Sequence, residues 1–290
     1  MNPAAGRGTA RARIPEFRAA FAALGLPEFQ ETRVAGDEER LAALAIEQGV
    51  ERIVAVGGDG TCARIASAVL ASGRSCRLAV VPCGTGNDFA KTLGVEKLRL
   101  HEIASLVERD QPTRIDVGRA DDHHFLNSCG FGFDASVLEG TQAVRFLKGE
   151  VIYIYSAVAQ LFTYRGVSVS VGSGARAEKV LMLTVSNGRY LGGAFRIAPH
   201  ASVIDGKLDV GCFGDIGVIG RVRIFAGALR GTHLGLPSVK TERVSSITLR
   251  FADPPLMEVD GELRRARSSI VKIGCVPLAL SVIAAPGYPL

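Results

Sequence analysis

The chain has 290 residues, of which 47% are hydrophobic and 22% charged, a length at which two domains are expected rather than one hydrophobic core. The formal net charge of +5 is mild and aromatic residues make up only 6%, which argues against nucleic acid as a partner. Apolar stretches such as 278–285 are far shorter than the roughly 18 residues of a membrane-spanning helix, and six cysteines without CxxC spacing indicate reduced thiols in the cytoplasm.

Residues 15 to about 117 alternate between patterns typical of helices and of strands. Pro15 and Gly36-Asp37 act as start signals for two helices that precede the first strand. In chain order we expect a helix over 15–25, a helix from 37 with Leu41, Leu44 and Ala45 on one face, a strand over 52–56, a helix over 63–72, a strand over 78–81 and a helix over 87–93. This alternation predicts a parallel sheet with helices on both faces.

The opening loop departs from this pattern. In doubly wound folds the first phosphate loop follows a strand, whereas Asn2-Pro3-Ala4-Ala5-Gly6-Arg7-Gly8 stands at the start of this chain. We hypothesise that the natural protein begins further upstream, and a native mass that starts at Met1 would reject this idea.

After residue 117 the pattern changes to short alternating runs separated by glycine-rich turns. Strands are expected over 124–128, 167–171, 180–185, 208–213, 246–251 and 269–273, with a helix over 151–162. This pattern predicts an all-β antiparallel sandwich or barrel-like second domain. We expect residues 1–117, joined by the C-terminal segment 276–290, to form an α/β nucleotide-binding domain, and residues 118–275 a β-rich lipid-substrate domain, with one cleft between them.

Two glycine-rich segments follow predicted strands of the first domain. Gly57-Gly58-Asp59-Gly60-Thr61 follows strand 52–56, and Pro82-Cys83-Gly84-Thr85-Gly86-Asn87-Asp88 follows strand 78–81. A strand, a glycine turn and a helix in this order bring backbone N–H groups together where a phosphate can bind. Each loop also carries an aspartate, and a carboxylate beside a phosphate requires a divalent cation or a proton transfer. The sequence therefore predicts phosphoryl transfer ahead of simple nucleotide binding.

Taken in order, these motifs resemble the diacylglycerol kinase catalytic-domain family of lipid kinases, with sphingosine, ceramide and NAD kinases and 6-phosphofructokinase as relatives. In the first domain the two glycine loops are accompanied by Asn2-Pro3-x-x-Gly6 and by Thr32 with Gly36-Asp37. In the second domain the matching segments are Asn127-x-x-Gly130-x-Gly132-x-Asp134-Ala135, Gly192-Gly193 through Ile197-Ala198-Pro199, Asp205-Gly206-Lys207-Leu208-Asp209 and Asp260-Gly261-Glu262. A lone GGDG would be weak evidence, whereas this ordered series is specific.

The resemblance implies a first domain like that of 6-phosphofructokinase and NAD kinase, with ATP as the phosphoryl donor. The nucleotide-binding residues it implies are Asn2, Pro3, Gly6, Arg7, Thr32, Gly57, Gly58, Asp59, Gly60, Thr61, Gly84, Thr85, Asn87 and Asp88. Arg7 stands where the family often has a lysine, and a guanidinium can neutralise phosphate in a bidentate manner. The plain alternatives are that Thr61 and Thr85 cap helices and that Thr32 is a buried strand residue.

The resemblance assigns catalysis to Glu262, Asp59 and Asp260. Glu262 resembles the general base that takes the proton of a lipid hydroxyl, and Asp59 would hold Mg²⁺ through water. Asp88 and Asp116 are candidates for the same acidic network, although Asp88 is alternatively a helix cap. The alternative for Asp260-Gly261-Glu262 is an ordinary hairpin turn.

A second, structural Mg²⁺ is implied at Asp205, with backbone oxygens from Ser202 and Lys207. An Asp-Gly turn is the alternative there.

The chain departs from the family at Cys62-Ala63-Arg64, where many relatives have Asn-Glu after GGDGT-x. Arg64 in place of a carboxylate should change contacts near the nucleotide or in the first helical turn. Two alternatives therefore stay open. One is a NAD kinase-like enzyme, which the second glycine loop and the late Asp-Gly-Glu disfavour, and the other is a nucleotide- or lipid-binding protein with weak catalysis.

A lipid acceptor implies docking at a membrane surface, expected here to be the inner one. Basic clusters at residues 7–18, 221–223 and 264–267 can assist this electrostatically, or they are ordinary solvated faces. The lipid would enter from the apolar side of the second domain, with Phe131, Phe133, Val137 and Leu138 or helix 151–162 as its wall or as plain core. Diacylglycerol is the default acceptor by analogy, and a homodimer is left open.

Overall fold

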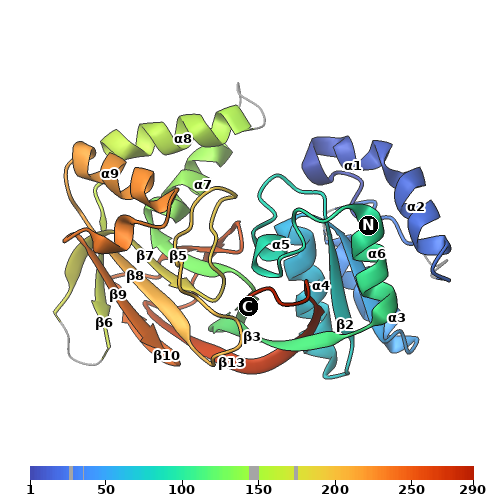
Figure 1. The fold of residues 1–290 in the computed structure, drawn as a ribbon. Helices are drawn as coiled ribbons and strands as arrows, with labels where there is room; N and C mark the ends of the chain where they lie inside the picture. The colour runs from blue at the N-terminus through green and yellow to red at the C-terminus, as the bar shows by residue number, and fades with distance from the viewer. Residues whose placement is uncertain (26–28, 35, 144–149, 173–175) are drawn as a thin grey trace. The chain divides into compact units, whose positions relative to one another are not determined.

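A computed structural model of the chain describes residues 1–25, 29–34, 36–143, 150–172 and 176–290, without the side chains of residues 7, 141–143 and 150–154. The chain forms two compact units (Figure 1). One unit comprises Met1–Val117 with Pro277–Leu290, and the other comprises Gly118–Val276. Among the described residues, no helix combines the length and the apolar character needed to cross a membrane.

The first unit is built on a parallel sheet. Its strands are β1 (Arg52–Gly57), β2 (Arg77–Pro82) and the C-terminal part of β13 (Ile270–Ile283). β1 and β2 pair in register up to Gly57 and Pro82, so the two strands end at the same edge of the sheet. β3 (Pro112–Ala120) pairs with β13 and leads into the second unit.

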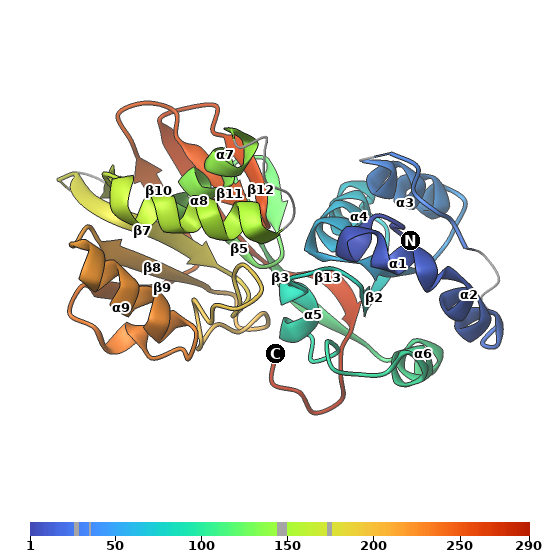
Figure 2. The same ribbon diagram turned by 90° about the horizontal axis from the view of Figure 1, so that it is seen from above.

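Helices cover both faces of this sheet (Figure 2), as predicted for an α/β domain. They are η1 (Ala5–Gly8), α1 (Thr9–Ala12), α2 (Ile14–Ala22), α3 (Asp37–Glu47), α4 (Asp59–Ser72), α5 (Asp88–Thr92) and α6 (Leu100–Arg109). Phe17 and Phe21 of α2 pack with Ile103 and Val107 of α6 in one core cluster that also contains strand residues. In α3 the buried apolar residues are Ala42 and Ile46, whereas Leu44, which was expected on the packed face, is exposed.

The second unit has two layers of strands around a hydrophobic core. One layer contains β4 (His123–Phe125), β3, the N-terminal part of β13 and β10 (Ser246–Arg250). The other contains β9 (Val239–Val244), β8 (Leu208–Gly214), β7 (Glu178–Ser186), β5 (Ser128–Gly132), β11 (Leu256–Val259) and β12 (Glu262–Arg265), and β6 (Val167–Val171) pairs with both β7 and β10. Phe131 and Leu183 from one layer meet Leu249 and Val271 from the other. This arrangement confirms the predicted antiparallel sandwich.

Three helices lie on the outer face of the β7 layer, together with the short η2 (His233–Gly235). They are α7 (Phe133–Ala143), α8 (Glu150–Thr163) and α9 (Val218–Ala228) (Figures 1 and 2). Phe133 and Val137 pack with Ile224 of α9 in a second core. Phe131, Phe133 and Val137 are therefore buried core residues, while Leu138 is half-buried.

The prediction of one continuous strand over 124–128 is wrong, because two separate strands are found there. β4 ends at Phe125 and β5 begins at Ser128, because the backbone N–H groups between them donate to the side chain of Asp260. Helices α6, α7 and α9 were not predicted. Internal glycines weaken the helical signal of α7 and α9, and Gly140 is needed because the Ser156 hydroxyl of α8 occupies the position of a side chain there.

Candidate active site

Three loops of the first unit meet at the edge where β1 and β2 end. The loop 57–61 leads from β1 into α4, the loop 82–88 leads from β2 into α5, and the opening loop approaches both. Backbone contacts show how closely the loops pack. A Cβ on Gly84 would lie 2.5 Å from Gly58 Cα, and a Cβ on Gly6 would lie 2.6 Å from the Cys83 carbonyl oxygen. Only glycine fits such approaches, so these residues set the geometry of the edge.

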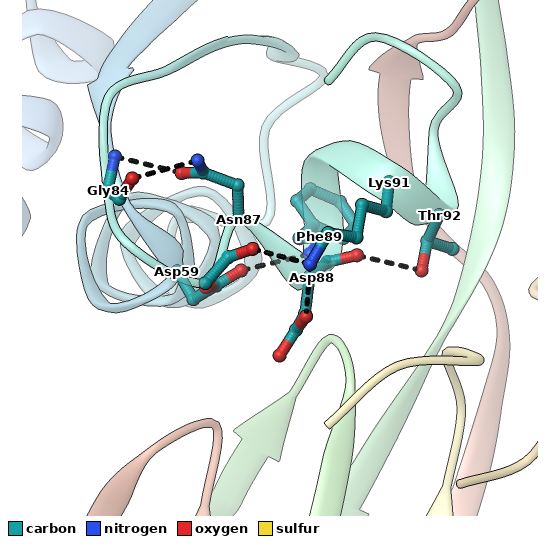
Figure 3. Close-up of polar contacts among 8 residues, drawn as sticks. Asp59, Gly84, Asn87, Asp88, Phe89, Lys91 and Thr92 are labelled. Carbon is teal, nitrogen blue, oxygen red and sulfur yellow. Dashed lines mark hydrogen bonds and ion pairs between the residues drawn. The ribbon is translucent and has the colours of Figure 1, made fainter. Parts of the chain in front are cut away.

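Asn87 braces the second loop from inside. Its Oδ1 accepts a hydrogen bond from the Gly84 N–H at 2.8 Å, and its Nδ2 donates to the Gly84 carbonyl at 2.9 Å (Figure 3). Asn87 has a φ of 53°, a left-handed conformation that asparagine tolerates better than most residues. The amide therefore fixes the loop in shape, and this explains why an asparagine stands at this position.

Asp59 and Asp88, the aspartates of the two loops, lie close together (Figure 3). Asp59 is the first residue of α4 and its Oδ1 accepts a hydrogen bond from the Phe89 N–H at 2.9 Å. Asp88 is buried, and its Oδ1 lies 3.1 Å from Lys91 Nζ, which also donates to the Gly86 carbonyl at 2.7 Å. Lys91 was not singled out from the sequence, although its i+3 spacing from Asp88 on a helix is the signal of an ion pair.

The pKa of Asp59 is raised above the ordinary value of an aspartate. Burial is the main cause and the neighbouring Asp88 charge adds to it, while the Phe89 N–H and the Lys91 charge act in the opposite direction. A carboxylate held in this way favours a nearby positive charge, whether a proton or a metal ion. The two aspartates therefore concentrate negative charge where the loops 57–61 and 82–88 meet.

Asn2 connects the opening loop with two helices. Its backbone N–H donates to the Val56 carbonyl at 2.9 Å, and its Nδ2 donates to Glu38 Oε1 at 3.0 Å and to Thr61 Oγ1 at 3.2 Å. Thr61 is buried, and its side chain fills the space that a Cβ on Gly57 would need. Glu38 is a buried carboxylate of α3 that the sequence did not point to. These residues hold the opening loop against β1.

The remaining predicted nucleotide residues belong to the same loops or lie beside the start of the chain. Thr85 is exposed in the second loop, Pro3 is buried in the opening loop, and the Thr32 N–H donates to the Met1 carbonyl at 3.0 Å. Arg7 is part of η1, and its side chain lies outside the described residues. Arg64 reaches the turn before α3, where a Cβ on Gly36 would lie 3.5 Å from its Nη1.

Asp116 of β3 is fully buried in the first unit. Its Oδ1 accepts a hydrogen bond from the Leu278 N–H of β13 at 2.8 Å, and Arg114 Nε donates to the Leu278 carbonyl at 2.8 Å. Leu278 is held on both sides in a left-handed conformation, with a φ of 47°. Asp116 therefore has a structural role, which is to hold the backbone of Leu278. A part in the acidic network with Asp59 and Asp88 stays a prediction.

The segment Asp260-Gly261-Glu262 forms a tight hairpin in the second unit. Val259 and Glu262 are paired across the turn, and Asp260 and Gly261 have φ values of 47° and 85°, as a two-residue type I′ turn requires. The buried Asp260 carboxylate accepts hydrogen bonds from three successive backbone N–H groups, of Leu126 at 2.6 Å, Asn127 at 2.8 Å and Ser128 at 3.2 Å. The hairpin is therefore fastened to the start of β5.

Glu262 is the first residue of β12 and is half-buried, with a side-chain exposure of 30%. It forms an ion pair with Arg264, and the Glu258 side chain accepts a hydrogen bond from the Gly261 N–H. The buried Glu258 is a second carboxylate behind the turn that the sequence did not reveal. Asp260 and Glu258 both hold the turn, and Glu262 is the carboxylate whose side chain is partly open to solvent.

Asp134, at the start of α7, is another buried acid of this unit. Its Oδ1 accepts a hydrogen bond from the Ala135 N–H at 2.8 Å, and its Oδ2 lies so close to Gly130 that a Cβ there would collide with it. Gly130 is paired with Glu258 across β5 and β11. Burial raises the pKa of Asp134 to about 7.

The predicted second metal site at Asp205 contains an arginine. Asp205 Oδ1 accepts a hydrogen bond from the Lys207 N–H at 2.9 Å, as in an Asx turn, and Oδ2 pairs with the Arg243 guanidinium. Ser202 and Lys207 lie in the same loop before β8. Arg243 Nε also lies 3.6 Å from Asp209 Oδ2, so both carboxylates at this place are already paired with a fixed positive charge, and the residues present do not fit a divalent cation. In the described part of the chain no cluster of three or more His, Cys, Asp or Glu residues could hold a metal ion.

The arginines considered for membrane contact differ in their surroundings. Arg264 pairs with Glu262, Arg265 donates to the Pro254 carbonyl, and Arg267 pairs with Asp122. Arg221 is buried and is no part of a solvated basic face. The basic clusters read from the sequence are therefore largely occupied by contacts within the protein.

Two family models match consecutive parts of the chain. Residues 1–120 match the model of the diacylglycerol kinase catalytic domain, and residues 127–284 match that of the YegS C-terminal NAD kinase beta sandwich-like domain. A protein of Pseudomonas putida named "Probable lipid kinase YegS-like" is 32% identical over 88% of this chain and 84% of its own length. The diacylglycerol kinase of Bacillus subtilis is 25% identical over 90% of this chain and 88% of its own. A crystal structure of a diacylglycerol kinase from Bacillus anthracis covers 98% of this chain and 95% of its own, with a TM-score of 0.73 at 22% identity.

Proposed function

The chain belongs to the diacylglycerol kinase catalytic-domain family and is a lipid kinase of that family, and from this premise we propose that it transfers the γ-phosphoryl group of ATP to the hydroxyl of diacylglycerol, giving phosphatidic acid. The observation that carries the proposal is the meeting of three glycine loops and two aspartates at one sheet edge. The named diacylglycerol kinases among the relatives support the choice of acceptor.

ATP phosphates would bind at the edge formed by the loops 2–8, 57–61 and 82–88. Backbone N–H groups at the start of α4 point toward the loops, and the positive end of this 14-residue helix favours an anion. The glycines allow the phosphates to approach the backbone, because a Cβ would block them. Arg7 and Thr85 are the side chains proposed to add charge and a hydroxyl donor, while Asn2, Thr61 and Asn87 keep the loops in place.

A divalent cation fits the acidic pair of this edge. Asp59 and Asp88 lie together, and burial with like charge raises the pKa of Asp59, which a metal ion would reverse. Mg²⁺ needs only one or two carboxylates because it keeps much of its water. Asp59 would hold the ion with Asp88 as its neighbour, and Mg²⁺ bound there would neutralise charge on the phosphates. Lys91 pairs with Asp88 and holds its carboxylate in place.

Glu262 is the proposed general base. Its carboxylate takes the proton of the lipid hydroxyl while that oxygen forms a bond to the γ-phosphorus. The bond between the γ-phosphorus and the bridging oxygen breaks, and ADP leaves with the electron pair. Asp260 and Glu258 hold the turn so that Glu262 keeps its position. Arg264 pairs with Glu262 and orients its carboxylate.

Incubating the purified protein with Mg²⁺, γ-labelled ATP and a mixture of diacylglycerol, ceramide and NAD tests the proposal. Labelled phosphatidic acid from the wild type and none from Asp59→Asn is the expected result. Labelled ceramide phosphate would move the acceptor within the lipid kinases. Labelled NADP would assign a NAD kinase-like activity instead, and nucleotide binding without any product would indicate the catalytically weak binding protein.

A further inference from the structure

Two neighbouring helices of the second unit, α8 and α9, expose large apolar side chains. Phe162 of α8 is 67% exposed and Ile219 of α9 is 84% exposed. Among the described side chains, the large apolar ones exposed on these helices and at the residue that follows α9 are Tyr155, Val158, Phe162, Ile219, Val222 and Leu229. On each helix the residues recur at spacings of three, four or seven, so they form one stripe along it. Exposed apolar surface of this extent on two adjacent helices indicates a binding face.

The two stripes point to the same side of the unit. The inner faces of both helices pack into one core, with Ala157 and Leu161 from α8 and Ile224 and Ala228 from α9. This core lies on the outer face of the β7 layer, and both views show α8 and α9 on that side of the sheet (Figures 1 and 2). Because the inner faces meet the same core, the opposite faces are turned away from the sheet together.

Arg221 joins the two helices into one platform. This buried guanidinium donates to the carbonyls of Leu161 at 2.8 Å and Tyr164 at 2.7 Å, at the C-terminal end of α8. It also pairs with Asp215 at 2.8 Å and donates to the Ile216 carbonyl at 3.0 Å, just before α9. The carbonyls at a helix end lack partners in the helix, so Arg221 fixes the end of α8 to the start of α9.

Among the described side chains of α8 and α9, the only charged ones are arginines. Arg165, Arg223 and Arg230 are exposed at the ends and along the helices, and none pairs with a carboxylate among the described residues. The described side chains of α8 and those of α9 include no aspartate or glutamate. By contrast, Arg264, Arg265 and Arg267 are each bound within the protein. A surface with apolar stripes and exposed arginines complements an anionic bilayer.

We propose that the outer faces of α8 and α9 form the docking surface on which this protein binds an anionic lipid bilayer. Phe162, Ile219 and Val222 enter the boundary between headgroups and acyl chains, and the arginines bind lipid phosphates. This inference rests on the proposed function, since a kinase acting on diacylglycerol must reach an acceptor that lies in a membrane. It locates that contact on α8 and α9 rather than at the arginines next to Glu262.

Sedimentation with vesicles of phosphatidylcholine, with and without phosphatidylglycerol, tests the surface without any catalysis. We expect the wild type to bind the anionic vesicles and to be released by salt. Two double variants should each bind these vesicles at least about tenfold more weakly than the wild type: Phe162→Asp/Ile219→Asp and Arg223→Glu/Arg230→Glu. The matched controls Leu44→Asp on α3 and Lys97→Glu, both exposed in the first unit, should bind like the wild type.

Two further measurements separate this inference from the proposed function and from a second copy of the chain. Phosphorylation of short-chain, water-dispersed dioctanoylglycerol should be unchanged in both double variants, while phosphorylation of diacylglycerol in vesicles falls. If the wild type does not bind vesicles, or if both double variants bind them as well as the wild type does, the proposed docking surface is wrong. This conclusion does not depend on the kinase activity. A wild-type dimer that Phe162→Asp/Ile219→Asp converts to monomers with vesicle binding intact would assign the face to self-association and overturn the proposal.

Discussion

Asp59 Oδ1 accepts a hydrogen bond from the Phe89 N–H at 2.9 Å, which joins the first turn of α4 to the first turn of α5. The two residues are 30 positions apart, and this bond places the aspartate of one glycine loop beside the aspartate of the next. The consequence is an electrostatic conflict, since burial and Asp88 both raise the pKa of Asp59. Carboxylates with a strongly shifted pKa are common at functional sites, because a bound cation or proton compensates the buried negative charge.

Asp59→Asn should therefore separate stability from activity. The amide oxygen keeps the contact with Phe89, while the unfavourable buried charge is removed, so the free energy of unfolding at pH 7 should stay equal or rise. Phosphoryl transfer should fall by about a thousandfold or more, as expected when the metal-binding charge is lost. Thermal unfolding and a labelled-ATP assay measure the two effects. A variant that is both less stable and fully active would contradict the assignment.

Gly60→Ala tests whether phosphates approach the first loop. A Cβ on Gly60 would meet no protein atom within 4 Å, and alanine is favoured in a helix, so stability should be maintained or raised by up to about 1 kcal/mol. If phosphates lie against this backbone, ATP affinity measured by calorimetry should fall at least about tenfold. Gly235→Ala, which also meets no atom within 4 Å, is the matched control and should leave ATP affinity unchanged. Unchanged ATP affinity in Gly60→Ala would place the phosphates elsewhere.

Asp260→Ala should affect both folding and catalysis through the hairpin. Three backbone N–H groups lose a charged acceptor in a buried setting, which costs about 3 kcal/mol or more of unfolding free energy. Because the turn then loosens, Glu262 is displaced and kcat should fall while ATP affinity remains. Denaturant unfolding, ATP titration and steady-state kinetics check the three parts. An unchanged unfolding free energy would show that these hydrogen bonds do not hold the hairpin.

Asp134 should make stability fall as pH rises. Its pKa is about 7 in the fold and near 4 when unfolded, so between these values the folded state binds the extra proton. Stability from this group is then present in full below about pH 4 and is lost by at most about 1.4 kcal/mol per pH unit up to about 7. Asp134→Asn, which resembles the protonated acid, should remove this slope. Denaturant unfolding at several pH values measures it, and parallel wild-type and variant curves would contradict the shifted pKa.

The loops of the first unit were predictable because their information is local. The order of strand, glycine turn and helix is written into residues 52–61 and 78–88, and parallel strands bring both turns to one edge. Asn87 was predicted only as a nucleotide-binding residue, and its bracing of the loop through Gly84 was not predicted, although the contact spans only three residues. The sandwich was predictable for a similar reason, since alternating runs and glycine turns recur along 118–275.

Other features depend on partners that are distant in sequence. Asp260 is fastened to Leu126 and Asn127, more than 130 positions away, and that contact ends the strand expected over 124–128. Arg221 appeared as part of a basic surface cluster, but its partners at the end of α8 lie about 60 positions earlier. Arg243 reaches Asp205 across 38 positions and adds a positive charge where an ion was expected. Spacing along the chain cannot reveal such pairs.

Single-turnover transfer of labelled phosphate from ATP to diacylglycerol, compared between wild type and Glu262→Gln, tests the central claim most directly. The variant is isosteric and removes the proton acceptor together with the charge that pairs with Arg264. This pair is partly exposed and contributes little to stability, so ATP affinity and stability should stay close to those of the wild type. We expect the transfer rate to fall by about 10²–10⁴-fold. A variant that binds ATP and transfers phosphate at the wild-type rate would show that Glu262 is not the base.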